Sequence, residues 1–145
     1  MVDLTSNTGG IVSPNPFWLA SAPPANSGDQ IMRAFDHGWG GAVWKTLGDP
    51  IRNVSSRYGA IHHGDRRIIG LNNIELITDR PLEVNFAEMA EVKRRYPKHA
   101  VIASLMVGSK DEWRDIIKRS IDAGADGLEL NFGCPHGMCE RGMGS

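Results

Sequence analysis

The chain has 145 residues, of which 41% are hydrophobic and 23% are charged, the composition of an ordinary globular protein. Its 16 basic and 17 acidic side chains leave a net charge of -1, which argues against binding to nucleic acid or to an anionic membrane surface. No apolar run reaches the roughly 18 residues needed to cross a bilayer, and the first residues lack the plan of a signal peptide. We therefore expect a cytoplasmic protein with neither nucleic acid nor membrane as a partner.

The first predicted strand covers residues 16–20 and leads into a turn-rich stretch. Apolar residues then recur with a helical period up to Gly38, and Ser27 with Gln30 three positions later resembles a capping box. A second strand at residues 42–44 ends at Lys45. This succession of strand, helix and strand predicts a βαβ unit.

Residues 46–78 show no sustained period, and a loop of this length is usually functional or disordered. A second helix is predicted from Leu82 to Tyr96, with Phe86, Met89 and Ala90 on its inner face.

The most strand-like segment of the chain is residues 101–106. A capping box at residues 109–112 begins a third helix, which ends at Gly124. The inner face of this helix is predicted from apolar spacing to hold Trp113, Ile116, Ile117, Ser120 and Ile121. The fourth strand, residues 127–131, runs into a glycine-rich loop that holds both cysteines.

Four strands alternating with three helices predict an α/β fold with a parallel sheet. This is about half of a (β/α)₈ barrel, which typically needs about 250 residues. A doubly wound four-stranded domain is the alternative, although it would leave a large apolar face at a sheet edge. We favour the half-barrel.

Functional side chains in such barrels gather where strands end at their carboxyl face, which selects Ser21, Lys45, Asn131 and Cys134. Lys45 could equally be a solvated lysine at a strand end, and Cys134 could be a small buried hydrophobe. Asn131 offers both a donor and an acceptor, which suits the edge of a pyrimidine or flavin ring. Asn73 lies in the long loop and could be merely a turn former.

The two cysteines, Cys134 and Cys139, are too few and too close for a disulfide framework, so reduced thiols are expected. Together with His136 and with His62 or His63 they could form a metal site, but the usual C-x₂-C pairing is missing and we expect no metal. The chain also lacks a G-x-G-x-x-G or Walker-type loop, so dinucleotide binding by this segment is not predicted.

Ordered motifs along most of the chain resemble those of the dihydropyrimidine dehydrogenases, specifically their flavin-containing (β/α)₈ TIM barrel of the dihydroorotate dehydrogenase type. The motifs that carry this resemblance are Asn15-Pro16-Phe17, Leu19-Ala20-Ser21-Ala22, Gly38-Trp39-Gly40-Gly41, Lys45-Thr46, Asn53-Val54-Ser55, Asn73-Ile74-Glu75, Ile102-Ala103-Ser104, Cys134-Pro135-His136-Gly137 and Glu140-Arg141-Gly142-Met143-Gly144.

The resemblance implies an oxidoreductase in which reduced FMN gives a hydride to C6 of uracil or thymine while an acid protonates C5. Cys134 matches the catalytic cysteine, and a thiol with a pKa of about 8.5 is largely protonated at pH 7 and can donate. The family's FMN contacts match Ala20, Ser21, Lys45 and Thr46.

The residues that match the family's pyrimidine contacts are Asn73, Glu75, Asn131, Phe132 and Gly133. Phe132-Gly133 stands where the family has a more polar pair.

The resemblance further implies that residues 1–145 are the N-terminal half of one FMN-binding barrel, with four strands and three helices. The rest of the barrel and a cysteine-rich segment that carries [4Fe-4S] clusters do not occur in this sequence. Electrons would come from NAD(P)H through a partner flavoprotein that holds FAD and iron–sulfur clusters, and the complete enzyme would be an oligomer. Two alternatives stay open: a dihydroorotate dehydrogenase, and a truncated half-barrel without catalytic activity.

Overall fold

A four-stranded parallel sheet forms the centre of the protein, in a computed structural model that describes residues 2–51, 58–71 and 76–133. The strand order is β3-β4-β7-β8, and each neighbouring pair is parallel. The strands are β3 (Trp18–Leu19), β4 (Gly41–Leu47), β7 (Ala100–Leu105) and β8 (Gly127–Leu130). The parallel sheet and the four strand positions predicted from the sequence are confirmed.

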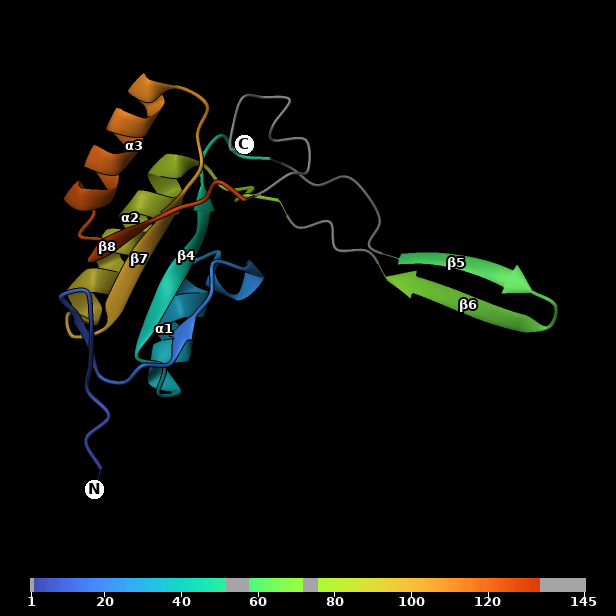
Figure 1. Cartoon of the computed structure of the whole chain (residues 1–145), viewed down its shortest axis with the longest axis horizontal. Coiled ribbons are helices and arrows are strands. Elements are labelled where there is room, and N and C mark those ends of the chain that lie inside the picture. Colours follow the sequence, from blue (N-terminus) through green and yellow to red (C-terminus); the bar gives the residue numbers. More distant parts are fainter. Residues whose placement is uncertain (1, 52–57, 72–75, 134–145) are drawn as a thin grey trace.

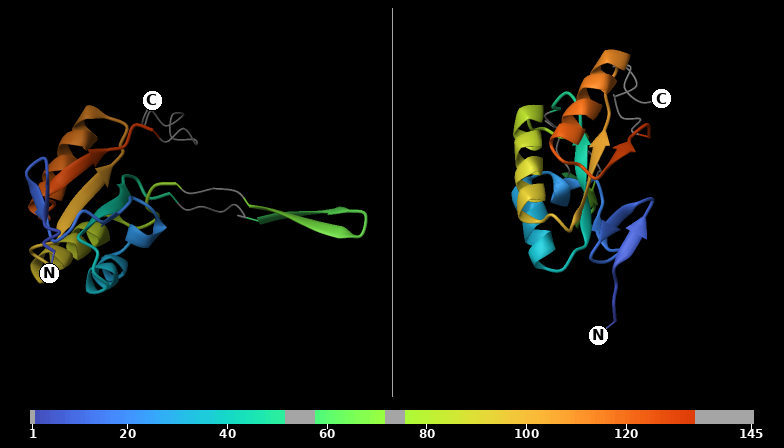
Figure 2. Two further views of the ribbon diagram at one scale, coloured as in Figure 1. Left: turned by 60° about the horizontal axis from the view of Figure 1, so that its bottom comes forward. Right: turned by 90° about the vertical axis from the view of Figure 1, so that its left-hand side faces the viewer.

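Three helices cover one face of this sheet (Figures 1 and 2). They are α1 (Gly28–Asp36), α2 (Leu82–Arg95) and α3 (Lys110–Asp122), and a short 3₁₀ helix, η1 (Pro23–Ala25), precedes α1. Parallel neighbours need such crossover connections, because the chain must return to the same end of the sheet before each new strand.

The helix ends follow the predicted capping chemistry. Ser109 and Glu112 form a complete capping box at the start of α3. At the start of α1 the Ser27 side chain accepts from the backbone N–H of Gln30, but the Gln30 side chain accepts from the Ser27 hydroxyl instead of from its backbone. Gly38 and Gly124 have φ values of 93° and 86°, the left-handed conformation that ends a helix.

The core lies between the helices and one face of the sheet. Strand and helix residues that share it are Ala42, Trp44, Leu47, Val101, Ala103, Leu105, Ile31, Phe35, Phe86, Met89, Val92 and Ile116. Inside this apolar layer the indole N–H of Trp44 donates to Asn85 Oδ1 at 3.0 Å, so the buried donor is satisfied. Two predicted core positions are wrong: Ala90 is exposed, and Ile121 is 60% exposed because it lies on the solvent side of α3.

Two antiparallel hairpins were not predicted. The first pairs β1 (Ser6–Thr8) with β2 (Ile11–Ser13) through Gly9 and Gly10, whose φ values of 60° and 94° suit a type I′ turn. The second pairs β5 (Tyr58–His63) with β6 (Arg66–Leu71) inside the region where no regular structure was expected. Gly64, with φ 58°, permits its two-residue turn.

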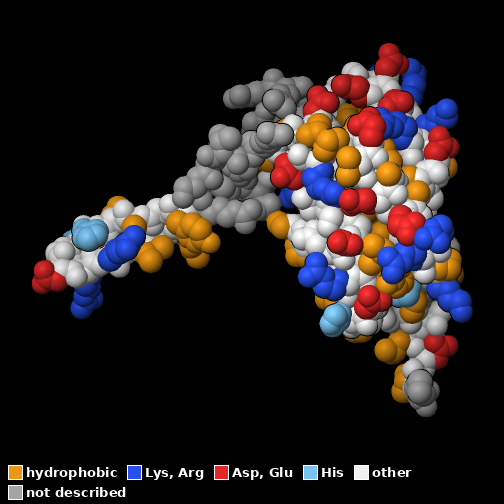
Figure 3. Space-filling model, turned by 180° about the vertical axis from the view of Figure 1, so that it is seen from behind, with side chains coloured by type: hydrophobic (Ala, Val, Ile, Leu, Met, Phe, Trp, Pro, Cys, Tyr) orange, Lys and Arg blue, Asp and Glu red, His pale blue; other side chains and the backbone are white. Residues whose placement is uncertain are grey.

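The second hairpin is exposed along its whole length and extends away from the sheet (Figures 1 and 3). Its strands carry both apolar and basic side chains, in the sequences YGAIHH and RRIIGL. Because an isolated two-stranded ribbon is at best marginally stable in water, contacts beyond its own ladder are needed to hold it in this form.

The first hairpin covers the amino ends of the sheet strands. The Trp18 indole N–H donates to Ser13 Oγ at 3.0 Å, and a Cβ placed on Gly127 would lie 2.7 Å from the Ile11 side chain. The amino end of the sheet is therefore closed by packing, and the carboxyl end is left for a functional site.

Candidate functional site

The face of the sheet that points away from the helices carries polar side chains near its carboxyl end. Strand register shows which residues face this way, because side chains alternate along a strand and paired residues share a face. Ala103 and Leu105 lie in the core on the helix side, so Ser104 faces the opposite, inner side. Glu129 pairs with Ser104 and therefore shares that inner face.

An irregularity in β4 brings two consecutive side chains to this inner face. Trp44 pairs with Ala103 and Leu47 pairs with Leu105, so β4 uses one residue more than β7 over the same distance. Lys45 and Thr46 together stand opposite Ser104, which is the arrangement of a β-bulge. Regular alternation would have turned one of the two toward the helices, whereas the bulge keeps Trp44 and Leu47 in the core.

A chain of hydrogen bonds links three strands across this end of the sheet. The hydroxyls of Thr46 and Ser104 lie 2.9 Å apart, and Asn131 Nδ2 donates to Thr46 Oγ1 at 3.0 Å. The amide oxygen Oδ1 of Asn131 accepts from the backbone N–H of Gly133 at 3.2 Å. Ser104 is fully buried and Thr46 is 4% exposed, so water does not compete for the bond between their hydroxyls.

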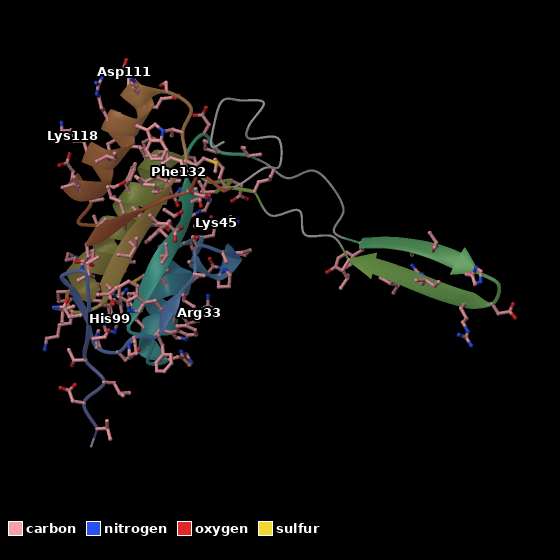
Figure 4. The ribbon with its side chains drawn as sticks, in the orientation of Figure 1. Arg33, Lys45, His99, Asp111, Lys118 and Phe132 are labelled. Atoms are coloured by element: carbon pink, nitrogen blue, oxygen red, sulfur yellow. The ribbon has the colours of Figure 1, made fainter. Side chains whose placement is uncertain are left out.

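A second hydrogen bond joins the two edges of the sheet. Ser21, just beyond β3, donates from its hydroxyl to Glu129 Oε1 at 2.8 Å. Lys45 lies on β4, between these edge strands, and is 7% exposed (Figure 4). The site therefore combines hydroxyls, an amide, a carboxylate and a largely buried ammonium group, and a buried ammonium group is stable only among polar or charged partners.

The structure brings together four of the predicted site residues: Ser21, Lys45, Thr46 and Asn131 lie at the same end of the sheet. Ala20, directly before Ser21, is exposed. Phe132 is 57% exposed, and its ring lies 5.8 Å from that of Trp113 on α3, so it contacts the helix layer.

The remaining predicted residues lie outside the described ranges. These are Cys134, Asn73 and Glu75, together with the cysteine and histidine ligands of the alternative metal site that follow residue 133. Among the residues that are described, no group of three or more His, Cys, Asp or Glu side chains could hold a metal ion.

Sequence reasoning missed Ser104 and Glu129. Both lie inside predicted strands, and the alternation of each strand would have assigned them to the face opposite Ala103 and Leu128. A polar residue on the inner face near the carboxyl end of a strand is the signal that selects such positions.

Fold and site together define a class of protein. A parallel sheet with helices on one face, a packed amino end and polar side chains at its carboxyl end is the arrangement of part of a (β/α)₈ barrel. None of the helices in the described part of the chain has the length and apolar character of a membrane span.

No family model matches the chain, but individual proteins do. It is 41% identical to a chloroplastic dihydropyrimidine dehydrogenase (NADP(+)) of Arabidopsis thaliana and 40% identical to the NAD-dependent dihydropyrimidine dehydrogenase subunit PreA of Escherichia coli K12, in each case over 99% of this chain. It covers 36% and 35% of these relatives, about a third of their length. The resemblance to dihydropyrimidine dehydrogenase predicted from the motifs is confirmed.

A more distant relative agrees with the fold. The catalytic subunit of dihydroorotate dehydrogenase B from Thermoplasma acidophilum is 30% identical over 94% of this chain, which covers 43% of that protein. The α/β fold is thus that of a partial barrel of the dihydroorotate dehydrogenase type, as predicted.

Proposed function

We propose that residues 1–145 form the N-terminal half of a single FMN-binding barrel in an enzyme that reduces the 5,6 double bond of uracil or thymine. The observation that carries the proposal is the gathering of Ser21, Lys45, Thr46 and Asn131 at one end of the sheet, in a chain 40–41% identical to dihydropyrimidine dehydrogenases. These are residues to which the family resemblance assigns contacts with FMN and the pyrimidine.

The donors at this end of the sheet suit a flavin. An isoalloxazine ring presents carbonyl oxygens and ring nitrogens along one edge, and the N–H groups of Lys45 and the hydroxyl of Thr46 can donate to such acceptors. The largely buried Lys45 ammonium would favour negative charge on the ring, because a charge interaction is strong where water is excluded. Ala20 and Ser21 would contact the ring from the first strand. Bound FMN would supply the hydride.

The pyrimidine would lie beside Asn131, with Phe132 and Gly133 on one side and Asn73 and Glu75 contributed by the long loop. An asparagine amide offers one donor and one acceptor to the adjacent C=O and N–H groups of the substrate. Cys134, three residues after Asn131, would give a proton to C5 as a general acid.

Electrons would reach the barrel from NAD(P)H through a partner that holds FAD and iron–sulfur clusters. The names of the two relatives support use of a nicotinamide cofactor by those proteins, since one is called NADP(+)-linked and the other NAD-dependent. We also propose [4Fe-4S] clusters and an oligomeric complete enzyme, located in the cytoplasm, although the Arabidopsis relative is named chloroplastic.

The second candidate is a dihydroorotate dehydrogenase. The 30% identity to a catalytic subunit of that enzyme supports it less well than the 40–41% identity to dihydropyrimidine dehydrogenases. A truncated half-barrel without activity is the remaining alternative.

The test is to purify the complete protein that carries these residues with its electron-donating subunit. We expect bound FMN in its visible spectrum, and NAD(P)H-dependent reduction of uracil or thymine but not oxidation of dihydroorotate. Activity with dihydroorotate alone would favour the second candidate. A protein that binds neither flavin nor pyrimidine would contradict both enzymatic functions.

A further inference from the structure

The amide group of Asn131 is held in one of its two possible orientations. The backbone N–H of Gly133 can only donate, so the group that it faces at 3.2 Å must be the amide oxygen of Asn131. The amide nitrogen then necessarily faces Thr46 Oγ1, at 3.0 Å. If the amide were flipped, its NH₂ group would face the backbone N–H of Gly133, so two donors would stand against each other. The hydrogen bonds among the buried hydroxyls would not make up for the bond lost at Gly133.

Thr46 is itself positioned from the other side. Its oxygen accepts from Asn131, and its hydroxyl lies 2.9 Å from that of Ser104 on β7. Ser104 is fully buried in a central strand, so its hydroxyl is a fixed point in the sheet. The bulge in β4 makes this contact possible, because it turns Thr46 to the inner face.

We infer that Ser104 is a positioning residue, which acts through Thr46 to fix the Asn131 amide for substrate recognition. This inference rests on the proposed function, in which Asn131 contacts the pyrimidine. With one N–H directed to Thr46 and one oxygen lone pair directed to Gly133, Asn131 keeps one N–H and one lone pair. That pair complements a neighbouring C=O and N–H, the –CO–NH– edge of a pyrimidine dione. Ser104 thus contributes to binding of the pyrimidine without touching it.

The experiment is a double-mutant cycle in the complete, FMN-loaded protein, with the dissociation constant of uracil measured by equilibrium dialysis. We expect Ser104→Ala to raise that constant by about five-fold, since it loosens one hydrogen bond of the chain. In the Asn131→Ala background, the same Ser104→Ala change should alter the dissociation constant of uracil by less than about 1.5-fold, because the amide that Ser104 positions is gone. The circular dichroism spectrum and the thermal midpoint of each variant should stay close to those of the wild type, which a general loss of structure would not allow.

Ser120→Ala is the matched control. It also removes a fully buried, hydrogen-bonded serine hydroxyl, which donates to Ile116 O within α3, and it should leave uracil binding unchanged. If Ser104→Ala fails to fold, the cycle is run with Ser104→Cys, which keeps the side-chain volume but bonds weakly. Equal effects of the serine change in both backgrounds would overturn the positioning role while leaving the proposed function intact. A wild-type protein that binds FMN but no pyrimidine would overturn both.

Discussion

Ser21, which follows the first strand of the sheet, donates a hydrogen bond of 2.8 Å to Glu129 on the last strand. Three strand spacings of about 4.8 Å separate the edges of a flat four-stranded sheet, roughly 14 Å in all, which is more than these two side chains span. The turn after Leu19 and the curvature of the sheet toward its inner face together bring the edges within reach. The contact therefore reports the curvature that a barrel requires.

Glu129 should support flavin binding through Ser21. Glu129→Ala leaves the Ser21 hydroxyl without its acceptor, and we expect the dissociation constant of FMN in the complete protein to rise about three- to ten-fold. Glu129→Gln keeps an oxygen acceptor and should raise the dissociation constant of FMN less than Glu129→Ala does. Fluorescence titration of the flavin measures both variants, and equal losses in both would show that the charge, not the hydrogen bond, matters.

Lys45 should be needed for flavin chemistry more than for folding. Lys45→Met keeps a long side chain but removes the ammonium group, so we expect pyrimidine reduction to fall at least about 100-fold through loss of electrostatic stabilisation. Lys45→Arg retains the charge and should recover part of the rate. Steady-state kinetics measure the loss, with circular dichroism as the control for folding. Full activity of Lys45→Met would remove Lys45 from the proposed machinery.

Cys134→Ala should nearly abolish pyrimidine turnover while FMN stays bound, because alanine has no proton to give to C5. The measurement is turnover with uracil beside the flavin content of the purified variant. Cys139→Ala, which changes the neighbouring cysteine in the same segment, is the control and should remain active. Retained turnover in Cys134→Ala would contradict the role of general acid.

Asn85 should contribute strongly to stability. Its Oδ1 accepts from the buried Trp44 indole, and its Nδ2 donates to the carbonyl oxygens of Arg80 and Pro81. Asn85→Ala would leave the indole N–H unpaired inside the core, which costs about 3 kcal/mol and lowers the thermal midpoint by roughly 5–10 °C. Ala87→Ser, at an exposed position of the same helix, should shift it by no more than about 2 °C.

Glu88 should make stability depend on acid pH. Its hydrogen bond with Arg80, and a weaker one from the Gly28 backbone, lower the pKa of its carboxyl group below the ordinary 4.5. A carboxyl with a lowered pKa stabilises the folded state above pH 4.5, and this contribution is lost as the pH falls through the folded pKa.

The variant Glu88→Gln tests this dependence. Because the Glu88 side chain is 32% exposed, solvent screens the pair, and we expect the variant to be about 1 kcal/mol less stable than wild type at pH 7. The difference should shrink as the pH falls below about 4.5. Urea unfolding at pH 7 and pH 3.5 measures it, and an equal difference at both values would assign the effect to packing.

Much of the fold was predictable because it depends on local patterns. Apolar runs located the four sheet strands, and serine caps located two helix starts, since both signals arise within a few residues. The hairpin at residues 58–71 was missed although Gly64-Asp65 is a typical two-residue turn, because its strands are wholly exposed and lack the expected alternation of apolar and polar residues.

The site was only partly predictable. Strand ends indicated Ser21, Lys45 and Asn131, and the family resemblance added Thr46. The bulge that turns Thr46 inward depends on how β4 pairs with β7, and no local pattern encodes such pairing. For the same reason Ser104 and Glu129 read as ordinary strand residues until their partners on other strands were known.

The bulge also constrains how this region can evolve. Deleting one residue between Trp44 and Leu47 would restore regular pairing with β7 and leave both of these side chains in the core, but only one side chain would then stand opposite Ser104 on the inner face. The core would stay intact, and the site would lose one of the two side chains that Lys45 and Thr46 now supply. Natural variants should therefore tolerate exchanges of residue type here more readily than the loss or gain of a single codon.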